Sequence, residues 1–210
     1  SINQDPVTIE LIEKTITEKA FSKGFIKPKP PSIRTGKKIA IIGSGPAGLA
    51  TAQQLNRAGH TITVFEKNEY IGGLLSLGIP DFKLEKWVVD RRTKILEQEG
   101  ILFKPSTDVG KNYPTSELNN NFDAICLAGG STIPRDLEIY GRELKGIYQA
   151  MPYLTQQNRI NKGISYPTEE IITARGKNVI ILGGGDTGAD CLGTAHRQKA
   201  KSIKQFELMP

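Results

Sequence analysis

The sequence predicts an α/β fold built on a parallel β-sheet. After residue 37, short apolar runs alternate with amphipathic helical stretches, and two of the runs lead directly into glycine-rich segments. Hydrophobic residues make up 38% of the 210 residues and charged residues 24%, which is the composition of a chain with a buried core. At about 150 residues per domain, this length allows one large domain, or one domain and part of another.

The predicted elements begin with an amphipathic helix over residues 7–25. The linker that follows, residues 27–37, carries Pro28, Pro30 and Pro31, which exclude a helix there. Because the helix is amphipathic, it must pack on the following domain or on a partner. Beyond the linker we expect strands at 38–43, 61–66, 101–104, 122–128, 178–183 and 202–208, helices at 46–58, 84–99, 148–160 and 187–198, and a loop at 68–83. The strongly apolar run 122–128 is predicted to be a buried strand.

A first G-x-G-x-x-G segment follows the first predicted strand. Gly43 allows a tight turn, Gly45 lets a pyrophosphate approach the backbone, and Gly48 lets the helix pack closely on the strand. The helix that starts near Pro46 directs its unpaired N–H groups at the phosphates. Glu66 ends the next strand, where a carboxylate can accept hydrogen bonds from ribose hydroxyls. The alternative is a glycine-rich turn that binds no ligand.

A second copy of the pattern lies 140 residues further on. Gly183, Gly185 and Gly188 take the same three roles, and Glu207 takes the place of the acid. Two fingerprints suggest two dinucleotides, as in a flavoprotein that takes hydride from NAD(P)H and binds FAD as well. We therefore expect a Rossmann-like FAD-binding domain and the beginning of a second, NAD(P)H-binding one. The predicted boundaries are 1–36 for the helix and linker, 37–175 for the FAD-binding domain and 176–210 for the truncated NAD(P)H-binding domain.

Two further loops are predicted to approach the flavin. The Gly72-Gly73 pair follows the first acid, where the backbone could pass close to a flavin; a plain surface turn is the alternative. The segment 127–134 resembles the "ATG"-type loop of two-dinucleotide flavoproteins, with Gly129 where that loop usually carries Thr. Backbone amides can make the contact without the Thr hydroxyl.

The composition excludes several other classes. With only Cys126 and Cys191, the chain cannot form a disulfide scaffold or hold a cysteine-ligated iron–sulfur cluster alone, and its two histidines make a zinc site improbable. We expect Cys126 in a buried strand and Cys191 in a helix, both as packing residues, so a dithiol reductase is excluded. There is no run of about 18 apolar residues and no signal peptide, which fits a reducing cytoplasm and no membrane. The net charge of +6 is spread along the chain, which favours a solvated surface over an anionic partner, and nucleic-acid binding is not expected.

Several segments together resemble a known family, the small (β) subunit of glutamate synthase, and more broadly the FAD/NAD(P)H module shared with dihydropyrimidine dehydrogenase. They are DPVTIELIEKTITEKAF, KIAIIGSGPAGLATAQQLNRAGH, VFEKNEYIGGLL, GIPDFKL, IPRDLEIYGRELKGI, AMPYLTQQNR and GGGDTGADCLGTAHRQ. The resemblance implies that NAD(P)H is oxidised at FAD, and that electrons pass through iron–sulfur clusters outside this chain to the glutamate-forming large (α) subunit. It implies no catalytic side chain, because hydride moves between cofactors. We expect no metal ligand either, because the chain has only two cysteines and two histidines.

The fingerprints, the loops and the resemblance together predict a set of cofactor-binding residues. For FAD they are Gly43, Gly45, Pro46, Ala47, Gly48, Leu49, Glu66, Lys67, Gly73, Leu74, Lys83, Ala128, Gly129 and Gly130; for the nicotinamide nucleotide they are Gly183, Gly184, Gly185, Asp186, Thr187, Gly188 and Glu207. NADH is favoured over NADPH, because an NADPH site usually has Arg or Lys at the end of this strand, where the chain has Leu208 and Met209. The Glu207 carboxylate before them can accept hydrogen bonds from a free ribose 2′-OH and repels a 2′-phosphate.

The chain also departs from the family. It lacks the clustered cysteines that precede the first helix in relatives, and it ends after the second strand of the nicotinamide unit, so we expect a fragment cut at both ends with little electron transfer of its own. Two other functions stay open: the same module in a ferredoxin- or pyrimidine-linked oxidoreductase, and a non-catalytic nucleotide-binding fragment.

Overall fold

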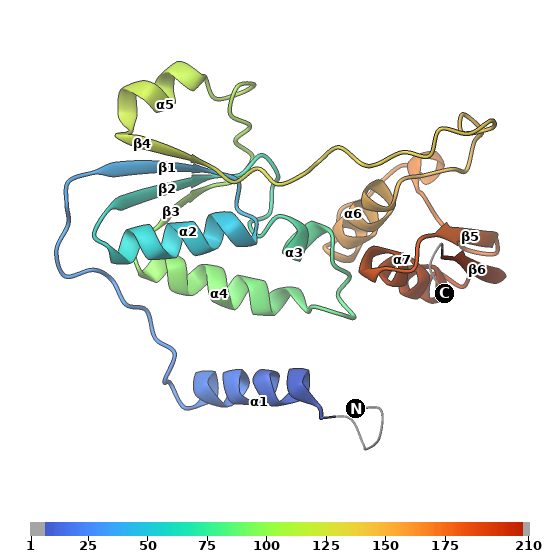
Figure 1. Ribbon diagram of the computed structural model, residues 1–210, viewed down its shortest axis with the longest axis horizontal. Coiled ribbons are helices and arrows are strands. Elements are labelled where there is room, and N and C mark those ends of the chain that lie inside the picture. The colour runs from blue at the N-terminus through green and yellow to red at the C-terminus, as the bar shows by residue number, and fades with distance from the viewer. Residues whose placement is uncertain (1–6, 208–210) are drawn as a thin grey trace.

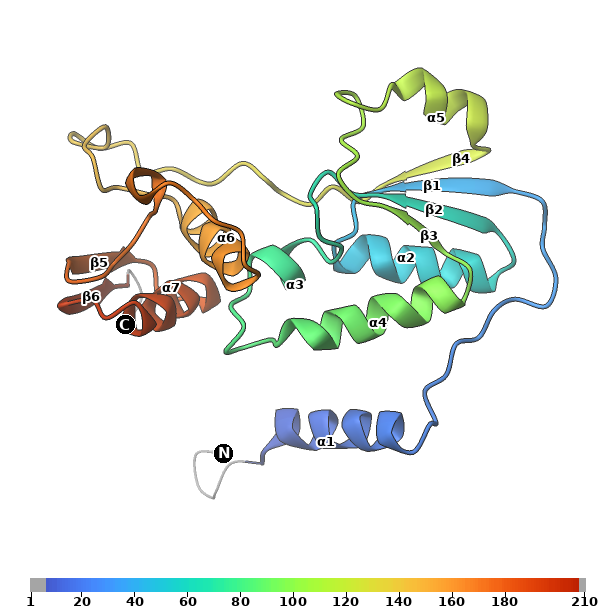
Figure 2. The same ribbon diagram turned by 180° about the vertical axis from the view of Figure 1, so that it is seen from behind.

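The chain forms two α/β units, which a computed structural model describes over residues 7–207 (Figures 1 and 2). Leu208 and Met209, used above in the nucleotide argument and at the end of the last predicted strand, lie outside the described residues. In chain order the elements are α1 (Ile9–Ser22), β1 (Lys38–Ile42), α2 (Pro46–Arg57), β2 (Thr61–Phe65), α3 (Leu74–Leu77), α4 (Lys86–Gln98), β3 (Leu102–Lys104), α5 (Thr115–Asn121), β4 (Ala124–Leu127), α6 (Ala150–Asn161), the 3₁₀ turn η1 (Thr168–Glu170), β5 (Asn178–Leu182), α7 (Asp186–Arg197) and β6 (Ser202–Phe206).

The first unit is a four-stranded sheet in the order β3-β2-β1-β4, with every pair parallel. Helices α2 and α4 cover one face, and α5 lies on the other (Figures 1 and 2). The parallel sheet predicted from the apolar runs is thereby confirmed. The order brings the carboxyl ends of β1, β2 and β4 to one edge, where ligands bind in open α/β sheets.

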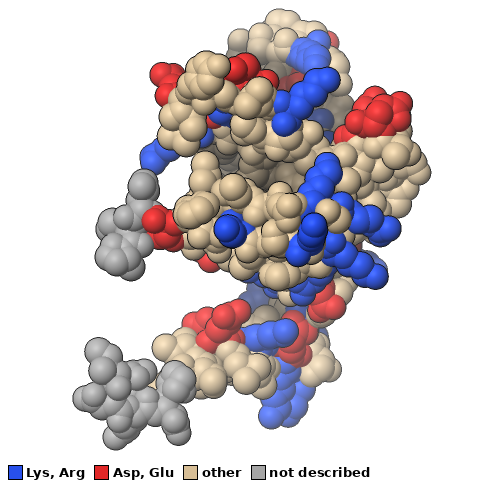
Figure 3. All heavy atoms as spheres, turned by 90° about the vertical axis from the view of Figure 1, so that its right-hand side faces the viewer, with Lys and Arg blue, Asp and Glu red and all other residues tan. Residues whose placement is uncertain are grey.

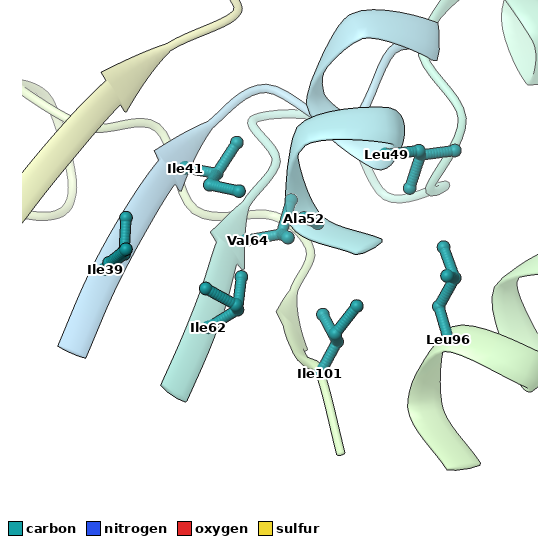
Figure 4. Close-up of a cluster of buried hydrophobic side chains, with 8 residues drawn as sticks. All are labelled: Ile39, Ile41, Leu49, Ala52, Ile62, Val64, Leu96 and Ile101. Atoms are coloured by element: carbon teal, nitrogen blue, oxygen red, sulfur yellow. The ribbon is translucent and has the colours of Figure 1, made fainter. Parts of the chain in front are cut away.

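The main core lies between this sheet and its two helices (Figure 4). Ile41, Ile62, Val64 and Leu96 are completely buried. Each such side chain contributes about 1.5–3 kcal/mol when it leaves water, so this layer supplies much of the stability of the unit. The full cluster is Ile39, Ile41, Leu49, Ala52, Ile62, Val64, Leu96 and Ile101.

A buried carboxylate joins the linker to both helices. Glu99, at the end of α4, is fully buried. Its oxygens accept hydrogen bonds from the guanidinium of Arg57 (2.6 and 3.3 Å), the amide of Gln53 (3.4 Å) and the backbone N–H of Lys29 (3.0 Å). The proline-rich linker is therefore attached to the α2–α4 layer, because one of its N–H groups helps to satisfy this charge.

The strand β4 corrects one expectation. Predicted as a buried strand, it lies at the sheet edge and is largely exposed: Leu127 is 81% exposed, and Cys126 is only half-buried. Apolar composition predicted burial on both faces, but β4 pairs with β1 alone, and within residues 7–207 no strand pairs with its outer side.

Three short elements occur where no regular structure was predicted. Helix α3 lies inside the predicted loop at 68–83, α5 precedes β4, and η1 precedes β5. The four residues of α3 are too few for a recognisable period, and α5 buries only Leu118, so it has no apolar stripe.

The second unit pairs β5 with β6 in parallel and packs α7 against them. Its core includes Leu154 from α6, together with Ile181 and Cys191. Helix α6 lies within the range predicted for the FAD-binding domain, yet its apolar side chains pack with the second unit. The predicted boundary at residue 175 stays a prediction.

Helix α1 lies outside both units and contacts the first one through α4 (Figures 1 and 2). It contacts α4 through Arg91, whose guanidinium pairs with Glu18 (2.6 and 2.8 Å) and lies 3.5 Å from the centroid of the Phe21 ring. Its aliphatic residues Ile9 and Ile16 stay exposed, so the expected packing is present only near its carboxyl end. Neither α1 nor any other helix within residues 7–207 has the length and apolar character needed to cross a membrane.

Candidate functional site

The first fingerprint forms a turn between β1 and α2 that only glycine can make. Gly43 has φ +107°, in the region that side chains rarely adopt, and its N–H donates to the carbonyl of Phe65 (2.8 Å). A side chain at Gly43 would overlap the carbonyl of Ala128, and one at Gly48 would overlap the carbonyl of Gly43. The turn is therefore packed tightly against α2 and the end of β4.

The centre of the turn is open. No atom lies within 4 Å of a Cβ built at Gly45, which caps α2, and Pro46 occupies the first turn of that helix, where its missing N–H costs nothing. Pro46 and Ala47 are exposed beside this opening. The free N–H groups at the start of α2 thus face space into which an anion can enter.

The acid at the end of β2 is occupied by protein donors. Glu66 is buried, and its carboxylate accepts hydrogen bonds from the backbone N–H and hydroxyl of Ser44 (3.0 and 2.6 Å) and from the backbone and amide N–H of Asn68 (2.9 and 2.8 Å). A carboxylate offers about four lone-pair sites, so all of them are used. Glu66 thereby fixes the fingerprint loop to β2, and a ribose hydroxyl must replace one of these donors to bind it.

The Gly72-Gly73 loop lies against the fingerprint. The N–H of Gly72 donates to the Ser44 hydroxyl (3.0 Å), and a Cβ built at Gly73, which has φ +55°, lies 2.9 Å from the Cα of Gly45. The structure therefore brings together the turn, this loop and Ala128, three segments far apart in sequence. Leu74, Lys67, Gly129 and Gly130 are exposed around them.

Two predicted contact residues lie elsewhere. Leu49 is buried in the main core, and its N–H donates to Gly45 within the helix. The ammonium of Lys83 lies 2.8 Å from a carboxylate oxygen of Asp190 and 3.9 Å from one of Asp186, both on α7. The close contact with the Asp190 carboxylate raises the pKa of Lys83. For both residues a flavin contact stays a prediction.

The second fingerprint repeats the geometry between β5 and α7. Gly183 has φ +112°, a side chain at Gly188 would overlap its carbonyl, and the space around Gly185 is open. A side chain at Gly184 would overlap the carboxylate of Glu207, so this acid lies at the turn and does not point into the sheet. Asp186 and Thr187 are exposed at the start of α7.

Sequence reasoning missed two residues at the junction of the units. Asn158, buried on α6, donates its amide to the carbonyls of Leu77 (2.9 Å) and Gly78 (3.3 Å), just beyond the Gly72-Gly73 loop. Asp190 is the buried partner of Lys83. Asn158 lies in YLTQQN and Lys83 in GIPDFKL, two segments that are not general features of dinucleotide-binding folds and could have marked this junction.

On the side of the second unit shown in Figure 3, Lys and Arg side chains group together. Exposed basic residues of this unit lie at the amino ends of β5 and β6, opposite the fingerprint: Arg175, Lys177, Lys199 and Lys201. A strand of five residues spans about 16 Å, so these charges act on a nucleotide only at long range. Within residues 7–207, no three acidic, His or Cys side chains converge as a metal site requires.

Cys191 should resist alkylation in the native protein. Burial raises the pKa of its thiol to about 11, and the charge of Asp190 acts in the same direction. At pH 8 such a group is thiolate in roughly one molecule per thousand, and the thiolate is the reactive form. We expect iodoacetamide at pH 8 to label half-buried Cys126 first, with Cys191 labelled only in denaturant, as peptide mass spectrometry would show. Faster labelling of Cys191 would contradict this burial.

Two open glycine turns, each between a parallel strand and a helix, define a two-dinucleotide α/β protein. Residues 37–209 match the sequence profile of the pyridine nucleotide-disulphide oxidoreductases, and the chain belongs to that family. Cys126 and Cys191 lie on different units, in β4 and α7, so they do not form the dithiol that the family name suggests.

Comparison with curated proteins confirms the resemblance inferred from the motifs. The chain is 55% identical to the glutamate synthase [NADPH] small chain of Mycobacterium tuberculosis and 52% identical to the glutamate synthase [NADH] of Saccharomyces cerevisiae. Both alignments cover 100% of this chain, but only 43% and 10% of those proteins. The chain thus spans less than half the length of these relatives.

Among solved structures, FprA from Mycobacterium tuberculosis in complex with NADPH aligns with a TM-score of 0.65. The sequence identity is 21%, and the alignment covers 84% of this chain and 43% of that one. This likeness confirms the predicted fold of Rossmann-like units.

Proposed function

We propose that this chain is the part of a glutamate synthase small subunit where NAD(P)H passes hydride to FAD. The observation that carries the proposal is the pair of fingerprint turns, each with an open glycine, Gly45 or Gly185, at the start of a helix. A chain that binds one dinucleotide needs only one such turn. The identity to glutamate synthase small chains supports the choice among oxidoreductases.

The residues at the first turn fit FAD. The opening at Gly45 and the start of α2 would hold the pyrophosphate, and the Gly73 backbone beside it would follow the dinucleotide. A ribose hydroxyl would donate to Glu66 in place of the side-chain amide of Asn68, because that amide belongs to a flexible side chain and can be displaced. When bound, FAD and the nicotinamide supply the hydride chemistry, while the residues of this chain supply placement and electrostatics.

We further propose that electrons leave through iron–sulfur clusters held outside this chain, towards the large subunit of glutamate synthase. The two cysteines here cannot ligate such a cluster alone. A ferredoxin- or pyrimidine-linked oxidoreductase with the same module is the second candidate, and a nucleotide-binding fragment without catalysis is the third.

The test uses the full-length protein that carries this sequence, purified with and without a glutamate synthase large subunit. We expect a flavin absorption spectrum, and NAD(P)H oxidation that requires both glutamine and 2-oxoglutarate when the large subunit is present. A colourless protein that takes up no added FAD would refute FAD binding at the first fingerprint. Oxidation that depends on ferredoxin or a pyrimidine instead would favour the second candidate.

The enzyme should prefer NADH, because Glu207 lies against the second turn. Its carboxylate can accept hydrogen bonds from a free ribose 2′-OH but repels a 2′-phosphate. Two like charges near 4 Å cost roughly 1–4 kcal/mol, which corresponds to discrimination between about fivefold and several hundredfold. The sequence comparisons do not decide between the two nucleotides, since the relatives that are 55% and 52% identical are named for NADPH and NADH respectively.

The measurement is kcat/KM for both nucleotides in the parent and in Glu207→Gln, which removes the charge but keeps the shape. We expect the NADH preference to fall about tenfold in the variant. A parent that prefers NADPH would contradict the prediction. An unchanged ratio of the two kcat/KM values in Glu207→Gln would show that Glu207 does not set the preference.

A further inference from the structure

The loop between α3 and α4 reaches across to the second unit. Lys83 on this loop places its ammonium 2.8 Å from an oxygen of Asp190, whose side chain is 9% exposed in the second turn of α7. Beside it, the Phe82 ring lies over α7, so close that a Cβ built at Gly193 would be 2.5 Å from the ring. The guanidinium of Arg197 covers the ring at 3.6 Å from its centroid. Three consecutive turns of α7 therefore hold this loop.

The same loop is fixed to the first unit from its other side. The ammonium of Lys86, which is buried, donates to the carbonyls of Leu84 and Leu75, both at 3.1 Å, and to that of Ile79. From the other side, Asn158 of α6 donates its amide to the carbonyls of Leu77, Gly78 and Ile79, so α6 also holds this stretch. This stretch begins directly after Gly73, which contacts the first fingerprint, so a displacement of the loop displaces the backbone beside the first turn.

We propose that Asp190 is a positioning residue, which acts through Lys83 to hold α7, and with it the second fingerprint, in register with the first dinucleotide site. The inference rests on the proposed function, in which hydride passes between nucleotides on the two fingerprints. Such transfer requires the reacting atoms about 3–3.5 Å apart, and a misplacement of 1 Å can cost a hundredfold in rate. Asp190 lies a full turn beyond Asp186, the first residue of α7, so it acts on orientation and not by contact with the phosphates.

The contact has the features that such a role requires. A carboxylate buried at this depth is costly to leave unpaired, so Asp190 retains the Lys83 ammonium in one place. Lys83 itself is about one-third exposed on its loop, so it can be replaced without loss of a core side chain. No other Lys or Arg pairs with Asp190 among the ion pairs of residues 7–207.

The test is a double-mutant cycle in the full-length protein loaded with FAD. Asp190→Asn, Lys83→Met and the double variant are compared by anaerobic stopped-flow reduction of the flavin with NADH, and FAD content and nucleotide Kd are measured in parallel. We expect each single variant to slow flavin reduction about tenfold with FAD content unchanged. The double variant should be no slower than the slower single variant, because both remove one interaction. Asp123→Asn, which breaks an exposed ion pair with Lys37 in the first unit, should leave the rate unchanged.

Unchanged reduction in Asp190→Asn, or losses that add in the double variant, would overturn the inference. So would loss of FAD from Lys83→Met while Asp190→Asn keeps it, since that result places Lys83 on the flavin, as the sequence predicted. If Asp190→Asn does not fold, Lys83→Met alone tests the contact through the same rate and FAD content. A parent protein that binds no FAD would instead overturn the proposed function and the inference together.

Discussion

Replacing Gly48 by alanine is expected to remove FAD from the protein and to lower its stability. A Cβ at this position overlaps the carbonyl oxygen of Gly43, a backbone atom at the turn that cannot rotate away. Alanine gains about 1 kcal/mol in helix propensity over glycine, but overpacking against a fixed neighbour costs about 1–3 kcal/mol and can cost more. We expect the cost of the overlap to exceed the gain in helix propensity, because α2 can relieve the overlap only by moving away from β1, and that movement opens the phosphate-binding turn.

The matched variant is Gly45→Ala, at the open position of the same turn. A Cβ there meets no atom within 4 Å and the backbone has φ −64°, so the apoprotein should unfold within about 0.5 kcal/mol of the parent. It should nevertheless bind FAD at least tenfold more weakly, since the methyl group occupies the phosphate approach. Flavin titration and thermal unfolding of the apoproteins separate the two effects. Equal unfolding temperatures for Gly48→Ala and Gly45→Ala would contradict the proposed division between packing and ligand access.

The second large effect is expected at Glu99. Glu99→Ala removes the acceptor for Arg57, Gln53 and the Lys29 N–H at once, and should reduce the free energy of unfolding by about 3 kcal/mol. Asp123→Asn is the control, because it removes an ion pair between exposed side chains, worth less than about 1 kcal/mol. Urea unfolding at pH 7 measures both. A similar loss in the two variants would show that burial of Glu99 adds nothing.

The same residue predicts how stability depends on pH. Burial alone would raise the pKa of Glu99, but the hydrogen bonds from Arg57, Lys29 and Gln53 outweigh it and bring the pKa below its ordinary value. A carboxyl group with a lowered pKa in the folded state contributes stability above its unfolded pKa, and loses it as the pH falls through the folded pKa. Below about pH 5 the parent should therefore lose stability more steeply than Glu99→Gln. Parallel curves would exclude Glu99 from acid unfolding.

The sequence was informative wherever local chemistry sets the structure. The apolar runs at β1 and β2 predicted strands, and the structure buries both. The fingerprint glycines predicted turns, since Gly43 and Gly183 both need a positive φ that other residues rarely adopt. A run of apolar residues says nothing of its neighbours, however, so the burial predicted for β4 was wrong.

The residues that sequence reasoning missed belong to the junction, where partners come from distant positions. Asn158 binds carbonyls some 80 positions earlier in the chain, and Asp190 pairs with a lysine more than 100 positions away. Neither shows a local pattern, because a buried amide or carboxylate on a helix can have many partners. Lys83 was predicted to contact FAD from a family motif, and that contact stays a prediction. Its ion pair with Asp190 on α7 could not be predicted from the sequence, because the two residues meet only in the packed structure.

Helix α6 has a consequence for how such proteins can be recombined. By position in the chain it precedes the second fingerprint unit, but Leu154 completes that unit's core, while Asn158 and Arg159 bind the first unit. A cut at residue 175 would leave Leu154 without its neighbours and expose Ile181 and Cys191. If the second unit is exchanged between relatives to change nucleotide specificity, the exchanged segment must therefore include α6. Asn158 and Arg159 of the transferred α6 would then have to fit the residues of the recipient protein that correspond to Leu77–Ile79 and Glu69.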